Sequence, residues 1–186
     1  SINGILALGM VFVITAGGID LSIGSMLALT SVIVGVVLNA TGNILLACVL
    51  AVATTTAFGL LNGVLVAKFD MFPFVVTLAT QLVIRGVAYI LSGGYSLSLA
   101  NAEFKKIGNG KLLGIIPYPI IMMLVIALLA YLVMHWTKFG RYIYAVGGNI
   151  QAAVASGINV FWTRTGSFVI MGFCAGVAGV IMTSRI

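Results

Sequence analysis

The sequence predicts an all-α protein, a polytopic bundle of helices that crosses a membrane several times. Apolar residues make up 62% of the chain and charged residues 6%, whereas soluble proteins average about 45–50% and about 25%. So few polar groups would not cover the surface of a soluble domain, but lipid requires no such cover. The apolar runs are long and do not alternate with period two, which favours helices over a membrane barrel.

Six apolar segments approach the length of about 20 residues that a membrane span needs. Pro73 falls in the first turn of one of them, where a proline is tolerated because its missing N–H has no helical partner. The chain opens directly in apolar sequence without a basic leader, so it resembles the interior of a longer protein with no cleavable signal peptide. The expected spans are Ile5–Ile19, Leu21–Leu38, Ile44–Ala67, Pro73–Leu91, Ile115–Met134 and Thr165–Thr183.

The charged and metal-binding residue types indicate which functions to exclude. The net charge is +6, but the basic residues stand singly between apolar runs, as in ordinary membrane loops, so no nucleic-acid partner is predicted. Cys48 and Cys174 lie within apolar segments and are expected to be small buried hydrophobes. His135 is the single histidine, and no close group of His, Cys, Asp and Glu predicts a metal site. No catalytic residue is predicted.

The stretch from Thr15 to Ser25 separates the first two spans and reads Thr-Ala-Gly-Gly-Ile-Asp-Leu-Ser-Ile-Gly-Ser. Gly17 and Gly18 can adopt backbone angles closed to other residues, which suits a hinge. Asp20 can accept hydrogen bonds from the free amides that open the next helix. A carboxylate at membrane depth is also costly and typical of a gate or ion site. The residues alone leave both interpretations open.

The fourth span carries a polar stripe formed by Thr77, Gln81, Arg85 and Tyr89. Their spacing of four residues places them on one helix face, which is not expected to meet lipid. Arg85 lies about 9 Å from Leu91 along a helix, so its guanidinium is able to reach the nearer membrane surface. The stripe predicts either a polar contact between helices or the wall of a translocation path.

Two glycine patterns carry less functional information. The Gly-Asn-Gly-Lys at Gly108 to Lys111, in the expected loop from Ser92 to Gly114, lacks the earlier glycine and the Ser or Thr of a phosphate-binding loop. Nucleotide binding through this motif is therefore not predicted. Gly59 and Gly63 in the third span, and Gly172 and Gly176 in the sixth, have the spacing that lets helix backbones approach closely. That spacing predicts packing rather than function.

The loop from His135 to Arg164 contains a predicted helix at Ile150–Ser156. Asn149 is a good N-cap for it, and Gly157 is a good residue to terminate it. A helix of two turns is marginal in water, so it needs either the rest of its own protein or a partner surface to hold it. Both arrangements remain open on this evidence.

Three motifs then carry a resemblance to a known family. They are the Gly-Gly-Ile-Asp-Leu-Ser-Ile-Gly-Ser of Gly17 to Ser25, the Arg-Gly of Arg85 and Gly86, and the loop that runs from Gly140-Arg141-Tyr142 to Gly157. In this order and spacing they resemble the permease subunit of bacterial ABC importers for ribose and related monosaccharides. The similarity covers essentially the whole chain.

The resemblance implies that residues 1–186 are one transmembrane permease domain, the middle part of a subunit with about ten helices, each of about 20 residues. Such permeases lie in the bacterial inner membrane and pair as two copies or two related chains. They bind two cytoplasmic ATPase subunits, which hold ATP and Mg²⁺, and receive sugar from a periplasmic binding protein, so this chain itself needs no cofactor. Residues of about 135–164 would be the cytoplasmic coupling loop. Its expected contacts with the ATPase are Arg141, Gly148, Asn149, Gln151, Ala152, Ala153, Ser156 and Gly157.

The chain departs from the family pattern at two positions of this loop. The family commonly has an acidic residue where Gln151 stands and often a basic one where Val154 stands, so docking by shape is expected more than docking by charge. With the coupling loop assigned, Gly17, Gly18 and Asp20 are interpreted as a capped hinge on the cytoplasmic side. The competing hypotheses are an ion-coupled secondary transporter or channel that uses Asp20 and Arg85, and a membrane scaffold.

Overall fold

The computed structural model describes residues 1–95, 97, 99, 101–112 and 114–186. The expected loop from Ser92 to Gly114 includes the other four positions, which lie outside this description. The all-α prediction is confirmed, since helices dominate the described chain and one short antiparallel strand pair is present. The elements are α1 (Ile2–Thr15), α2 (Ile23–Thr41), α3 (Ile44–Lys68), α4 (Pro73–Ser92), α5 (Ala102–Asn109), β1 (Lys111–Leu112), β2 (Ile116–Pro117), α6 (Tyr118–Trp136), α7 (Lys138–Gly148), α8 (Ile150–Ala155) and α9 (Val160–Thr183).

Five helices of the described chain, α2, α3, α4, α6 and α9, are long and apolar enough to cross a membrane. They correspond to five of the expected spans and make this a multi-pass membrane protein. The first expected span is the shorter helix α1, which has 14 residues. It ends at Thr15 rather than Ile19, because Gly17 turns the chain with φ +81°, an angle that residues with a Cβ rarely adopt.

The prediction of a polar loop from His135 to Arg164 is wrong, because most of this stretch is helical. Thr137 accepts a hydrogen bond from the Gly140 amide and starts α7. Asn159 accepts one from the Trp162 amide and starts α9 at Val160, five residues before the expected start of that span. These side chains satisfy amides that the first turn of a helix leaves free, and the apolar pattern alone did not reveal them.

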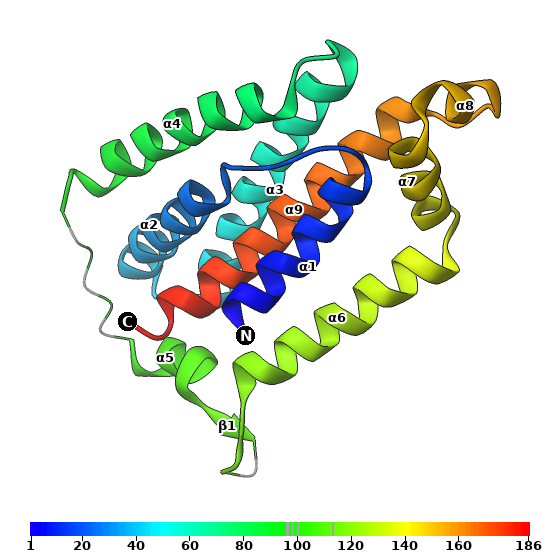
Figure 1. Cartoon of the computed structure of the whole chain (residues 1–186). Coiled ribbons are helices and arrows are strands. Elements are labelled where there is room, and N and C mark those ends of the chain that lie inside the picture. Colours follow the sequence, from blue (N-terminus) through cyan, green and yellow to red (C-terminus); the bar gives the residue numbers. More distant parts are fainter. Residues whose placement is uncertain (96, 98, 100, 113) are drawn as a thin grey trace.

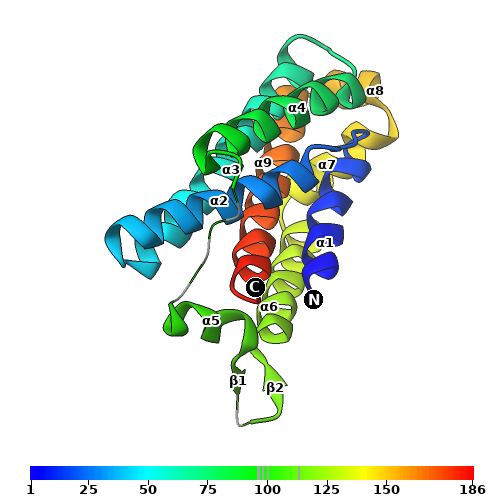
Figure 2. The same cartoon turned by 90° about the vertical axis from the view of Figure 1, so that its left-hand side faces the viewer.

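Helix α9 is the centre of the bundle, and α1, α2 and α3 pack around it (Figure 1). About 67% of its apolar window is buried, against 11% for α6, which packs on α1 at the outside. Helix α4 lies on the other side and packs mainly on α2. The view in Figure 2 shows α5 and the strand pair beyond the lower end of α9, with α7 and α8 near its upper end.

The four glycines with close-packing spacing have the predicted packing role, and the structure shows that they bring α3 and α9 together. A Cβ added at Gly172 would lie 2.5 Å from the Thr55 carbonyl oxygen, and one at Gly63 would lie 2.7 Å from the Thr165 Cα. Gly59 and Gly176 are equally close to the facing helix. Backbones in contact gain dispersion energy along their whole length, which is how membrane helices associate without a hydrophobic driving force.

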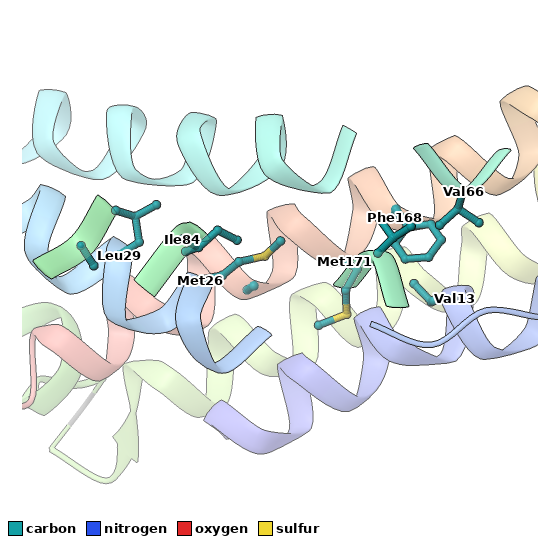
Figure 3. Packing of buried hydrophobic residues seen from close by; sticks show 10 residues of the cluster. Val13, Met26, Leu29, Val66, Ile84, Phe168 and Met171 are labelled. Carbon is teal, nitrogen blue, oxygen red and sulfur yellow. The ribbon is translucent and has the colours of Figure 1, made fainter. Parts of the chain in front are cut away.

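The main hydrophobic cluster fills the space between α2, α4 and α9. Met26 and Leu29 of α2 meet Ile84 of α4, and Phe168 and Met171 of α9 continue the cluster towards α1 (Figure 3). All five side chains are at most 2% exposed. This cluster holds α2 against α9 and α4 against α2. The outward-facing sides of α2 and α4 are therefore fixed relative to each other.

Candidate functional site

The segment between α1 and α2 dips into the bundle and is fastened there by Asp20. Its carboxylate oxygen Oδ1 accepts hydrogen bonds from the Ser22 amide at 2.8 Å and from the Ser22 hydroxyl at 2.6 Å. The Asn62 side-chain amide of α3 donates to the Ser22 hydroxyl at 3.1 Å. Asp20, Ser22 and Asn62 are all fully buried. The segment is therefore tied to α3 as well as to its own two helices.

The predicted role of Asp20 as the cap of the second span needs correction. Ser22 occupies the N-cap position of α2, and Asp20 bonds the amide of this residue rather than an amide of the first helical turn. The site is also deeper than a surface turn. Asn62 lies six residues before the end of α3 at Lys68, which is about 9 Å along a helix. Figure 1 shows the segment crossing below the upper end of α3.

Hydrogen-bond acceptors outnumber donors among the side chains of Asp20, Ser22 and Asn62. Among the described residues, the Asp20 Oδ2 and Asn62 Oδ1 atoms have no hydrogen-bond partner. Neither of the two ion pairs in that part of the chain involves Asp20. The same residues contain no group of three or more His, Cys, Asp or Glu that could hold a metal ion.

Two substitutions separate the hydrogen bonds of Asp20 from its charge. In Asp20→Asn, the side-chain oxygen can still accept from the Ser22 amide and hydroxyl, so we expect a small loss of stability. In Asp20→Ala, both buried donors of Ser22 lose their acceptor, which costs about 1–3 kcal/mol. Thermal unfolding of the purified protein in detergent measures the difference. Equal losses in the two variants would contradict this account, and normal assembly with abolished transport in Asp20→Asn would favour the ion-site interpretation.

The polar stripe on α4 divides into two parts. Thr77 is buried, and its hydroxyl donates to the Pro73 carbonyl oxygen of its own helix at 2.9 Å. Gln81 is half-buried, while Arg85 and Tyr89 are exposed. Thr77 therefore packs inside the bundle, and the rest of the stripe faces outward.

A cavity of about 270 Å³ lies where this stripe meets α2. Gln81 and Arg85 form its α4 side, and Gly24, Ser25 and Ala28 form its α2 side. A second cavity of about 260 Å³ continues along α2 from Ala28 towards the end of α4. It has hydroxyl groups in its wall, from Ser31, Ser92 and Thr183. We call the two cavities together the α2–α4 groove.

The short helix α8 is held by the residues that the sequence singled out. The Asn149 side chain accepts from the Ala152 amide at 3.0 Å, as an N-cap does. Gly157 adopts φ +76° after the helix, and the Ile158 amide donates to the Ala153 carbonyl oxygen at 3.0 Å. This six-residue reach is typical of a helix that ends at a left-handed glycine. Both capping predictions are confirmed.

The surface of α8 differs in one residue from the expected contact set. Ala153 is 3% exposed, so it packs against its own protein and does not contribute to a docking surface. Ile150 and Val154 are 40% and 59% exposed. The other seven expected contact residues are all exposed, namely Arg141, Gly148, Asn149, Gln151, Ala152, Ser156 and Gly157.

Helix α7 connects this surface to the bundle. A Cβ at Gly147 would collide with the Thr15 carbonyl oxygen at the end of α1. The Phe139 ring is so close to Gly166 of α9 that a Cβ there would lie 2.8 Å from it. A movement of α7 and α8 would therefore reach both α1 and α9 through contacts that leave no free space.

Sequence reasoning missed Ser22 and Asn62. The signal that could have identified Asn62 is a polar amide inside an otherwise apolar span, because such a group needs a partner within the membrane. Nothing in the sequence identified its partner, which is 40 residues away.

Residues 1–186, the whole chain, match the family described as "Branched-chain amino acid transport system / permease component". The chain belongs to this family. Other permeases align with this one over all or nearly all of its residues. It is 39% identical over 188 residues to the ribose import permease protein RbsC of Bacillus subtilis (strain 168), and 40% identical over 190 residues to that of Haemophilus influenzae. It is 36% identical over 182 residues to the L-arabinose ABC transporter permease protein AraH of Azospirillum brasilense.

These alignments cover 98–100% of the permease chain described above. They cover 58%, 58% and 53% of the three relatives, so the chain spans somewhat more than half of their length. No solved structure matches it. The relatives are permeases of sugar importers by name, and the expected resemblance to ribose and monosaccharide permeases is confirmed.

Proposed function

We propose that this permease is the membrane-spanning subunit of an ATP-driven importer that passes a monosaccharide into the cytoplasm. The observation that carries the proposal is the similarity of the entire chain to ribose import permeases at 38–40% identity. Ribose is the first candidate substrate for that reason. Relatives named for L-arabinose and D-allose are 36% and 35% identical, so pentoses and hexoses of related shape belong in the same test.

The proposed assembly contains four kinds of partner. A second permease copy completes the membrane part, two ATPase subunits bind on the cytoplasmic side, and a periplasmic binding protein delivers the sugar. Lipid of the bacterial inner membrane surrounds the exposed apolar faces. In this assembly the ATP and Mg²⁺ belong to the ATPase subunits, and this chain is a transport subunit rather than an enzyme.

Coupling would pass from α8 through α7 into the bundle. When the ATPase subunits close on ATP, they would move the exposed side of α8, including Gln151 and Val154. The contact of Gly147 with Thr15 supports a path into α1. The adjoining turn at Gly17 and Gly18 would act as the hinge, and Asp20 would anchor its other end. The bundle would thereby alternate between outward and inward openings.

The proposed sugar path includes Gln81 and Arg85 of α4, since both lie in the wall of the α2–α4 groove. Thr77 does not belong to it, because its hydroxyl bonds its own helix inside the bundle. The competing function, an ion-coupled transporter or channel, draws its support from Asp20, a buried acid outside the ion pairs of the described residues.

The test is to purify the full-length permease with the products of neighbouring genes and reconstitute it in vesicles. We expect an ATPase subunit to co-purify and labelled ribose, arabinose or allose to enter only when ATP and the binding protein are present. Uptake that follows a Na⁺ or proton gradient without nucleotide would overturn the proposal and favour the ion-coupled function. Loss of that gradient-driven uptake in Asp20→Asn would then identify the ion site.

A further inference from the structure

Helix α2 presents two small residues, Gly24 and Ala28, to the α2–α4 groove. Gly24 and Ala28 are one turn apart, both are exposed, and both line the cavity that Gln81 and Arg85 face. A Cβ added at Gly24 would meet no atom within 4 Å. The space in front of Gly24 is therefore part of the groove, and the absence of a side chain there keeps it open.

The polar groups in this wall have unused hydrogen-bonding capacity. Ser25 is 5% exposed and lines the cavity, yet no hydrogen bond of its hydroxyl to any residue in the described ranges is found. Gln81 and Arg85 likewise have no hydrogen-bond or ion-pair partner within the described part of the chain. These groups line the cavity without a partner from the described residues, so a ligand or water can bond them without breaking a hydrogen bond within the protein.

We propose that the α2–α4 groove binds a single neutral sugar ring in passage, and that Gly24 and Ala28 set its width. This inference rests on the proposed function and assigns the α2 side of the path. The serine hydroxyl and the glutamine amide can each donate and accept, while the guanidinium donates. A sugar ring carries several hydroxyls, each of which can donate and accept, so it matches this mixed set of groups.

The size and composition of the groove fit such a ligand. The first cavity, of about 270 Å³, falls just below the range of about 300–1,000 Å³ that holds drug-sized molecules, and one sugar ring is smaller than those. Ala28 lines both cavities, so the ring would pass its methyl group between two compartments. A larger groove of about 750 Å³ on the outer face of α3 and α9 has an almost wholly apolar wall, which suits lipid rather than sugar.

The experiment compares two glycines with open space in front of them. Gly24→Leu places a side chain in the groove, while Gly86→Leu places the same side chain on α4 where a Cβ also meets no atom within 4 Å and no groove wall lies. In the reconstituted full-length complex we expect ribose uptake to fall at least about tenfold in Gly24→Leu and to stay near wild type in Gly86→Leu. Gly24→Ala should have an intermediate effect.

Equal uptake by both leucine variants would overturn the inference while leaving the proposed function intact, since the wild-type complex would still import sugar. A second measurement covers the case that Gly24→Leu does not assemble. Gly24→Cys should react with a charged, water-soluble thiol reagent, ribose delivered by the binding protein should slow the reaction, and the parent chain with Cys48 and Cys174 gives the background. No reaction above that background, or no protection by ribose, would also overturn the inference.

Discussion

Gly172→Leu is expected to prevent the bundle from assembling and to have the largest effect on stability of any change considered. A Cβ at this position would lie 2.5 Å from the Thr55 carbonyl oxygen and 3.1 Å from the Gly59 Cα. Both neighbours are backbone atoms of α3, so no side chain can rotate away to make room. The helices would have to separate. Overpacking typically costs about 1–3 kcal/mol and occasionally more, and the upper end is expected here because only backbone can move.

Thermal unfolding and the yield of monodisperse protein in detergent test this expectation. Gly86→Leu is the matched control, because it adds the same side chain to a helical glycine that has no atom within 4 Å of its Cβ position. We expect the control to unfold near the wild-type temperature. A Gly172→Leu protein that is as stable as wild type would show that α3 and α9 do not pack as closely as the structure has them.

The fold follows from the sequence wherever one local pattern determines an element. Apolar runs predicted six spans, and five of them are helices long enough to cross a membrane. Glycine spacing predicted close backbone packing in the third and sixth spans, but not that α3 and α9 pack on each other. The start of α9 was missed, because Arg164 suggested a loop. This arginine lies 3.6 Å from Asp70 in the turn before α4, with 16% of its side chain exposed. A charge with that position is compatible with the first turns of a membrane helix, where it reaches the aqueous side.

The candidate site was only partly predictable, because one part depends on interactions within a single helix and the other on contacts between helices. Asn149 and Gly157 act on their own helix, so residue type and spacing were sufficient to place them. Asp20 acts through Ser22 on Asn62, and the α2–α4 groove requires Gly24 and Arg85 to lie side by side. Such pairings depend on how helices pack, which the spacing along one helix does not contain. Ala153 shows the same limit, since its burial depends on the chain around α8.

Val154→Asp is expected to uncouple the proposed importer without unfolding the permease. The Val154 side chain is 59% exposed on α8, so a carboxylate there remains solvated in the isolated chain, and surface changes of this kind usually alter stability by less than about 0.5 kcal/mol. If α8 docks on the ATPase, the same carboxylate is buried in the interface without a partner. An unpaired charge at a buried interface costs about 2–5 kcal/mol, which corresponds to a loss of at least about tenfold in coupled activity.

Sugar-stimulated ATPase activity and ribose uptake of the assembled complex measure the coupling, and thermal unfolding of the permease measures its stability. Val154→Leu is the matched control, since it keeps an apolar side chain at the same place and should retain both activities. A comparison of two charged variants distinguishes docking by shape from docking by charge. If Val154→Arg transports as well as wild type while Val154→Asp does not, the ATPase surface that faces α8 is acidic. If Val154→Asp retains full stimulation and uptake, α8 is not the coupling element, and the contact of Gly147 with Thr15 has only a structural role.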